Sequence, residues 1–136
     1  MKLIVAGGRD FDDYALVYRL LDKLLLEEPE LEIISGLAKG ADTIGKDWAD
    51  LYEVKCHKFP ADWDNIDVPG AVIKYHPSGK PYNAAAGNAR NRQMAEFGDA
   101  LLAFWSIPAS KGTGHMIDLA YERGLRVAIV RYKVTP

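Results

Sequence analysis

The stretch FWSIPASKGTGHMIDLA, Phe104–Ala120, decides the fold class of this chain. The apolar run Leu101–Phe104 predicts the end of a buried strand, and Gly112–Gly114 mark the place where a helix begins. Glycine lets a ligand approach the backbone closely, and the free N–H groups and positive dipole of a helix start favour an anion such as phosphate. The stretch therefore predicts a strand, a loop that faces a ligand, and a helix.

The same kind of joint occurs twice more, at VAGGRD (Val5–Asp10) and at ISGLAKGAD (Ile34–Asp42). Predicted strands and helices alternate along the chain, which is typical of a parallel sheet covered on both faces. In such a sheet the joints meet at one edge, and the ligand crevice lies there. We therefore predict an α/β fold, a Rossmann-like three-layer sandwich with a five-stranded, mostly parallel sheet in the order 3-2-1-4-5 and helices on both faces.

Apolar runs and helical spacing give the approximate bounds of the elements. The predicted strands are Lys2–Ala6, Leu31–Ser35, Val54–Phe59, Asp99–Trp105 and Leu125–Arg131. The predicted helices start after Asp12 and Asp13 and stop at Pro29, and then span Ala41–Tyr52, Asn88–Phe97 and Thr113–Arg123. Between the third strand and the third helix, prolines and glycines interrupt this rhythm and predict a small hairpin insert over about 68–83. A long connection in a compact domain is usually functional, often as a lid or an interface.

Composition limits the classes of function. The chain has 136 residues and a formal net charge of -2, which argues against a protein that wraps nucleic acid by bulk charge. Its one cysteine, Cys56, cannot form an intrachain disulfide or a cysteine-rich metal site. The three histidines, His57, His76 and His115, lack the spacing of metal ligands, so we predict no metal. No signal peptide or membrane-spanning run is visible, so we expect a cytoplasmic protein without a membrane partner.

The first two joints supply candidate ligand-binding residues. At the first, Gly7 and Gly8 precede Arg9, which could bind a phosphate or instead pair with a neighbouring aspartate. The second contributes Ser35, Gly36, Lys39, Gly40 and Asp42. Asp42 sits at the start of the predicted helix, so it could contact the ligand, cap the helix, or do both.

Two further segments complete the predicted site. Arg90 and Asn91, in the first turn of the helix expected at Asn88, could bind a phosphate and a sugar or base edge, or they could lie on a solvated face. After the third strand, Asp62 could accept ribose hydroxyls and Trp63 could stack on a base, although packing under the long loop is the alternative for Trp63. The remaining candidates, at the last joint, are Lys111, Gly112, Thr113 and Gly114.

Several of these motifs match a known family. ISGLAKGAD resembles a loop of DNA-processing protein A, and Arg90-Asn91-x-x-Met94 with Lys111–Gly114 resembles the LOG phosphoribohydrolases. Together with AGGRDF, FPADW and AGNARNRQM, the chain resembles a YspA-like member of the SLOG superfamily, as a single domain over 1–136. The resemblance implies a Rossmann-like fold that binds nucleotides or nucleotide-derived signals. It also implies that Arg90 and Gly112–Thr113 occupy the phosphate and ribose site of the LOG enzymes.

One departure from the LOG pattern affects the expected function. His115 and Met116 stand where the LOG enzymes have acidic residues. We therefore rank first the binding or sensing of a nucleotide or nucleotide-derived ligand, such as one related to ADP-ribose or NAD. The first alternative is hydrolysis of a nucleotide N-glycosidic bond, with Asp42 or Asp62 as the acid. The second is binding of single-stranded nucleic acid, against which the net charge argues. We expect a homo-oligomer and no cofactor.

Overall fold

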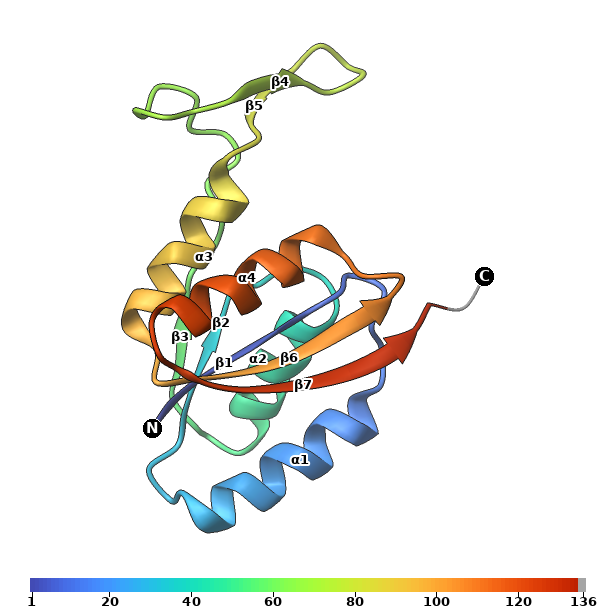
Figure 1. The fold of residues 1–136 in the computed structure, drawn as a ribbon, viewed down its shortest axis with the longest axis vertical. Coiled ribbons are helices and arrows are strands. Elements are labelled where there is room, and N and C mark those ends of the chain that lie inside the picture. Colours follow the sequence, from blue (N-terminus) through green and yellow to red (C-terminus); the bar gives the residue numbers. More distant parts are fainter. Residues whose placement is uncertain (135–136) are drawn as a thin grey trace.

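A computed structural model describes residues 1–134 and contains a five-stranded parallel sheet (Figure 1). The strand order is β3-β2-β1-β6-β7, with each neighbouring pair parallel. The bounds are β1 Lys2–Gly7, β2 Glu32–Ser35, β3 Cys56–Lys58, β6 Ala100–Ile107 and β7 Arg126–Lys133. Counted without the insert, this is the predicted order 3-2-1-4-5, which is confirmed.

Helices cover both faces of the sheet, which confirms the predicted three-layer sandwich (Figure 1). Their bounds are α1 Tyr14–Glu27, α2 Ala41–Leu51, α3 Ala86–Phe97 and α4 Lys111–Glu122. On one face Val17, Leu21 and Trp48 of α1 and α2 pack into a core with β1 and β6. On the other face Met94 and Met116 of α3 and α4 do the same. Residues of β1 alternate between these two cores, so both sides of the strand are apolar.

The elements differ from the predicted bounds at a few ends. α3 begins two residues before Asn88 because the small residues ahead of it continue the helix. α4 begins at Lys111, directly after its N-cap Ser110. β6 continues to Ile107 because β7 pairs with it as far as Lys133. The third strand is shorter than predicted and spans Cys56–Lys58 only.

The insert forms the predicted hairpin, which is separate from the main sheet (Figure 1). Its strands β4 (Ile73–Tyr75) and β5 (Pro81–Asn83) are antiparallel, and they project beyond the start of α3. Asn83 joins this arm to the body: its N–H donates to the Trp63 carbonyl at 2.6 Å, and its Oδ1 accepts from the N–H groups of Val72 and Ala85. The arm is therefore tied to the sandwich next to Trp63. Over residues 1–134, no helix has the length and apolarity needed to cross a membrane.

Candidate functional site

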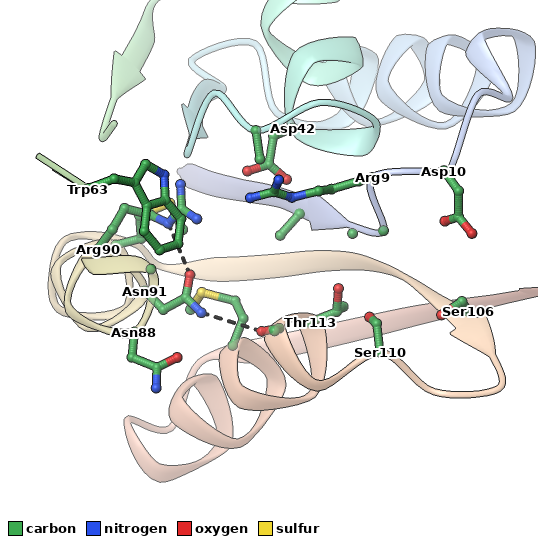
Figure 2. Close-up of a pocket in the computed structure, with 18 of the residues that line it drawn as sticks. Arg9, Asp10, Asp42, Trp63, Asn88, Arg90, Asn91, Ser106, Ser110 and Thr113 are labelled. Atoms are coloured by element: carbon green, nitrogen blue, oxygen red, sulfur yellow. Dashed lines mark hydrogen bonds between the residues drawn. The ribbon is translucent and has the colours of Figure 1, made fainter. Parts of the chain in front are cut away.

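A pocket of about 470 Å³ lies at the carboxyl edge of the sheet, where β1 and β6 end (Figure 2). This volume falls within the roughly 300–1,000 Å³ typical of small-molecule sites. Loops and helix starts from five segments form its walls. Nine predicted residues line it: Gly7, Gly8, Arg9, Asp42, Trp63, Arg90, Asn91, Gly112 and Thr113. The sheet therefore brings parts of all three predicted joints together, as the edge argument requires.

The other predicted residues do not line this pocket; they are Ser35, Gly36, Lys39, Gly40, Asp62, Lys111 and Gly114. Asp62 and Lys111 are exposed, and Gly114 lies under the Trp105 ring. The Ser35 hydroxyl is buried and is used inside the protein, because it donates to the Asp42 carbonyl at 2.8 Å and accepts from the Leu37 N–H.

The two glycines of the β2–α2 loop serve packing. A side chain on Gly36 would meet the Arg90 guanidinium at 2.5 Å, and one on Gly40 would meet the Gly8 carbonyl oxygen at 2.1 Å. Gly40 also has φ +95°, and Leu37 between them has φ 62°, a conformation that L-residues rarely adopt. Backbone outliers of this kind cluster at ligand sites. The loop therefore packs against two residues that line the pocket, Arg90 and Gly8.

Arg90 is half-buried and is held in place by the protein itself. Its Nη1 donates to the Gly36 carbonyl at 2.6 Å and its Nε donates to Asn91 Oδ1 at 3.2 Å. The sequence predicted Arg90 in the first turn of this helix. Because α3 begins at Ala86, Arg90 lies in its second turn instead. Burial lowers the pKa of the guanidinium, and the nearby Asp42 opposes this effect. The alternative of a solvated helix face is therefore wrong for Arg90.

Asn91 is buried and connects α3 with α4. Its Nδ2 donates to the Gly112 carbonyl at 3.4 Å and lies 3.2 Å from His115 Nδ1. Its amide oxygen and nitrogen are thus both engaged in hydrogen bonds within the protein. Figure 2 shows Asn91 between Arg90 and Thr113. Asn91 therefore fixes the helix start that borders the pocket, a role that the sequence did not indicate.

Asp42 is 5% exposed and faces the pocket from the second residue of α2. The N-cap of α2 is Gly40, so the interpretation of Asp42 as the cap is wrong. Burial raises the pKa of the carboxyl to about 6, while the Arg90 charge and backbone N–H groups, including those of Ala38 and Gly7, lower it. A buried carboxyl with a raised pKa destabilises the folded protein once it is ionised, and such groups are enriched at functional sites.

Arg9 is the second cation of the pocket, and unlike Arg90 it is exposed. Its guanidinium makes no hydrogen bond or ion pair with any residue between 1 and 134. Asp10, the neighbouring candidate partner, instead accepts a hydrogen bond from the Tyr132 hydroxyl at 2.6 Å. Figure 2 shows the Arg9 side chain extending toward Asp42. The alternative of an Arg9–Asp10 pair is therefore wrong, and the cation is available to a ligand.

Trp63 forms the wall of the pocket nearest the hairpin (Figure 2). The residue is 36% exposed, and its ring would lie 3.1 Å from a Cβ placed on Gly87. Gly87 thus leaves room for the indole against the start of α3. An indole with one open face can stack on a planar group.

The start of α4 adds polar groups that the sequence analysis missed. The N-cap Ser110 makes no side-chain capping bond, and its buried hydroxyl has no hydrogen-bond partner among residues 1–134. Ser110 lines the pocket together with Gly112 and Thr113. A helix start with an unpaired hydroxyl and free N–H groups is suited to an anion. The only sequence signal was a serine two residues before the glycine pair.

Comparisons with known proteins show what this chain is similar to. The family described as YAcAr, "YspA, cpYpsA-related SLOG family", matches residues 1–65. The X-ray structure of DNA processing protein A from Streptococcus pneumoniae superposes with a TM-score of 0.68 at 24% sequence identity. These findings support the SLOG superfamily. The superposition covers 94% of this chain and 49% of that one, so this chain spans about half the length of that protein. No curated protein sequence matches the chain.

The matched SLOG segment holds Arg9, Asp42 and Trp63, while Arg90 and the α4 start lie outside it. The site thus combines residues from the matched half with residues from the second half of the sandwich. Within the described part of the chain, no group of three or more His, Cys, Asp or Glu side chains is placed to hold a metal ion. The pocket is lined by its two arginines, Asp42, Trp63 and the start of α4.

Proposed function

We propose that this pocket binds a nucleotide or a nucleotide-derived ligand, with its phosphate between the two arginines and the start of α4. One observation carries the proposal: a free guanidinium, a fixed guanidinium and a helix start with an unpaired hydroxyl line the same pocket. Each of these groups favours an anion. They are concentrated in one place on a chain whose net charge is -2, which favours a small anion over a long polyanion.

The remaining walls suit the rest of a nucleotide. The open face of Trp63 provides a surface on which a base can stack. The Asp42 carboxyl is the acidic group that faces the pocket from α2, where it can accept a sugar hydroxyl. The volume of about 470 Å³ is compatible with a ligand of this size.

Hydrolysis of the base–ribose bond is a second candidate, and the position of Asp42 favours it. Its pKa of about 6 lets the carboxyl hold a proton near neutral pH and give it to the leaving base. The bond electrons then leave with the base, and water adds to the anomeric carbon while its released proton returns to the Asp42 carboxylate. Asp62, the other predicted acid, is exposed and outside the pocket. Met116 cannot act as an acid, and His115 contacts Asn91. These points rank hydrolysis below binding.

The experiment that tests the proposal combines binding with turnover. The protein is titrated calorimetrically with the four nucleoside monophosphates, ADP-ribose and NAD, and the same mixtures are analysed for free base by chromatography. Saturable binding of at least one ligand without base release supports a binding protein. Base release that disappears in Asp42→Asn and persists in the exposed control Asp62→Asn supports hydrolysis. If none of these ligands binds or is cleaved, the proposal is wrong.

The comparisons raise nucleic acid as a partner, because the similar structure is that of a DNA processing protein. For this chain the net charge favours a small ligand.

We also propose that the hairpin contacts a second copy of the chain or covers the pocket. Ile73 and Tyr75 on β4 are 49% and 68% exposed, which is unusual for side chains of this kind on a projecting strand.

A further inference from the structure

A groove of about 820 Å³ lies at the amino edge of the sheet, opposite the pocket at the carboxyl edge. The strands are parallel, so β1, β2 and β3 all start at this edge. The segments that follow α1 and α2 complete the groove, and it shares no lining residue with the pocket. Its apolar lining residues include Met1, Leu25, Pro29, Leu31, Tyr52 and Val54. We call this cavity the amino-edge groove.

Exposed apolar side chains adjoin the groove in the sequence. Leu26 and Leu51, each next to a lining residue, are 84% and 64% exposed, and the lining Tyr52 is 46% exposed. Large apolar side chains that gather in one region mark an interaction site, whereas single scattered ones do not. The groove and its surroundings therefore have the composition of a protein–protein contact.

The groove also carries an excess of negative charge. Its charged lining groups are Glu30, Glu32, Glu53, Lys55 and the Met1 amino group. Glu32 contacts His57 at 2.6 Å, whereas Glu30 and Glu53 are exposed and form no ion pair within residues 1–134. Both α1 and α2 end at the groove, and neither has a basic residue in its last turn to offset the negative end of its dipole. A partner for this groove should carry cations beside an apolar centre.

The hairpin arm carries such groups. Ile73 and Tyr75 alternate along β4, so their exposed side chains share one face of the hairpin. Lys74 and Lys80 are exposed next to them. Lys74 forms no ion pair within residues 1–134, and Lys80 lies 3.4 Å from exposed Asp64, a surface pair of little energetic weight. The arm thus offers two apolar side chains and two lysines that are free to change partner.

The arm and the groove lie toward opposite ends of the molecule. Figure 1 shows the arm at one end of the long axis, whereas the amino end of β1 and the end of α1 lie toward the other. Two copies that lie side by side in opposite directions therefore bring each arm next to the groove of the other copy. This arrangement has two-fold symmetry, the commonest in oligomers, and it makes the same contact twice.

We propose that two copies of the chain exchange arms. Ile73 and Tyr75 of each copy enter the amino-edge groove of the other, and the arm lysines meet the carboxylates of Glu30 and Glu53. This inference rests on the proposal that the arm contacts a second copy, and it is independent of the nucleotide proposed for the pocket.

Charge reversal on the two surfaces tests the contact. One variant combines Lys74→Glu with Lys80→Glu, and the other combines Glu30→Lys with Glu53→Lys. Each places like charges together, so each should weaken self-association in sedimentation velocity by at least about tenfold. An equimolar mixture of the two variants pairs opposite charges at both contacts and should restore association to within about threefold of the parent. Lys23→Glu on α1 and Glu122→Lys on α4, both exposed, are the matched controls and should associate as the parent does.

Glu53 also provides a variant that separates association from folding. Its φ of 54° favours glycine, and it directly follows the C-cap of α2. Glu53→Gly should therefore raise the midpoint of thermal unfolding while it weakens association by about two- to fivefold, as for one surface charge pair. Damage to the fold cannot explain weaker association in a stabilised variant.

The outcomes distinguish the groove from the arm. If the arm variant loses association and both groove variants keep it, the groove contact is wrong and the contact of the arm with a second copy stands. If both charge-reversed variants lose association and their mixture does not restore it, the pairing of arm with groove is wrong. A parent protein that is monomeric at every concentration overturns both the arm contact and the groove contact, and leaves the nucleotide pocket standing.

Discussion

Two arginines line the same pocket, and they differ in how the protein holds them. Arg90 is half-buried and donates hydrogen bonds to the Gly36 carbonyl and to Asn91, whereas Arg9 is exposed and has no such partner within residues 1–134. The part of the pocket around Arg90, here called the Arg90 wall, is therefore pre-organised before a ligand arrives. The Arg9 wall must order its side chain on binding, which costs conformational entropy. The same substitution should consequently have different effects at the two positions.

A chain of contacts explains why the first wall is rigid. Gly36 of the β2–α2 loop accepts from Arg90, Arg90 donates to Asn91, and Asn91 donates to Gly112 at the start of α4. Three segments that lie far apart in the sequence are thus joined next to the proposed phosphate position. Figure 2 shows the Trp63 ring beside Arg90, whereas the Arg9 side chain enters the pocket from the other side, toward Asp42.

The largest expected effect is that of Arg90→Ala, because it removes a ligand group and a structural link together. Loss of a charge-assisted hydrogen bond should weaken nucleotide binding by about 1.5–3 kcal/mol. The free energy of unfolding should also fall by about 1–3 kcal/mol, since the Gly36 carbonyl loses its donor and Asp42 loses a nearby cation. Calorimetry and urea denaturation measure the two effects. Arg92→Ala, an exposed arginine on the same helix, is the control. Unchanged stability in Arg90→Ala would contradict the rigid wall.

The Asp42 carboxyl should make stability depend on pH. Its pKa is raised from 3.8 to about 6 in the folded protein, so folding favours the protonated form. Stability from this group is complete below about pH 4 and is lost as pH rises through about 6, by about 3 kcal/mol in total. Asp42→Asn should therefore stabilise the protein at pH 7.5 by up to about 3 kcal/mol and much less at pH 4.5.

Urea denaturation of the parent and of Asp42→Asn at both pH values tests this. Asp62→Asn is the control, because that carboxyl is exposed and should leave stability unchanged at either pH. A stabilisation by Asp42→Asn that is equal at pH 4.5 and pH 7.5 would show that the charge of Asp42 is not the cause.

Arg9→Ala should affect binding alone. We expect affinity to fall by about 1.5–3 kcal/mol while the free energy of unfolding changes by no more than about 0.5 kcal/mol. Because Arg9 is exposed, its contribution should also weaken as salt is added, more than that of half-buried Arg90. Titrations at low and high salt measure both points, with Arg19→Ala on α1 as an exposed control. If Arg9→Ala and Arg90→Ala both leave affinity unchanged, the ligand binds elsewhere.

The sequence was informative where local pattern controls structure. Apolar runs identified the strands, and the preference for right-handed crossovers left few orders, so the sheet order was predicted correctly. Residues at strand ends and near helix starts gave nine of the pocket residues, because these joints meet at one edge of the sheet. The uses of Asn91, Gly36 and Ser110 were not predictable, because they depend on partners that the fold brings from distant segments. Lys39 lines a separate cavity between the β1–α1 and β2–α2 loops, and this position likewise depends on how the fold brings the two loops together.

The hairpin should contribute least to stability, because its two strands form a separate sheet and β4 is fully exposed. Val72 and Asn83 already contact each other at its base, since the Val72 N–H donates to Asn83 Oδ1 at 3.1 Å. Residues 73–82 can therefore be replaced by a two-glycine turn that keeps Asn83 and its bond to Trp63. We expect cooperative unfolding within about 1 kcal/mol of the parent, as a two-stranded hairpin is marginal by itself.

The same deletion separates the two roles proposed for the arm. A smaller particle in analytical ultracentrifugation, with unchanged affinity, identifies a contact between copies of the chain through Ile73 and Tyr75. Weaker nucleotide binding at constant particle size identifies a cover over the pocket, since the arm is attached beside Trp63. Ile73→Ser with Tyr75→Ser keeps the hairpin and should reproduce the first result but not the second. Loss of cooperative unfolding on deletion would show that the arm is part of the folded core.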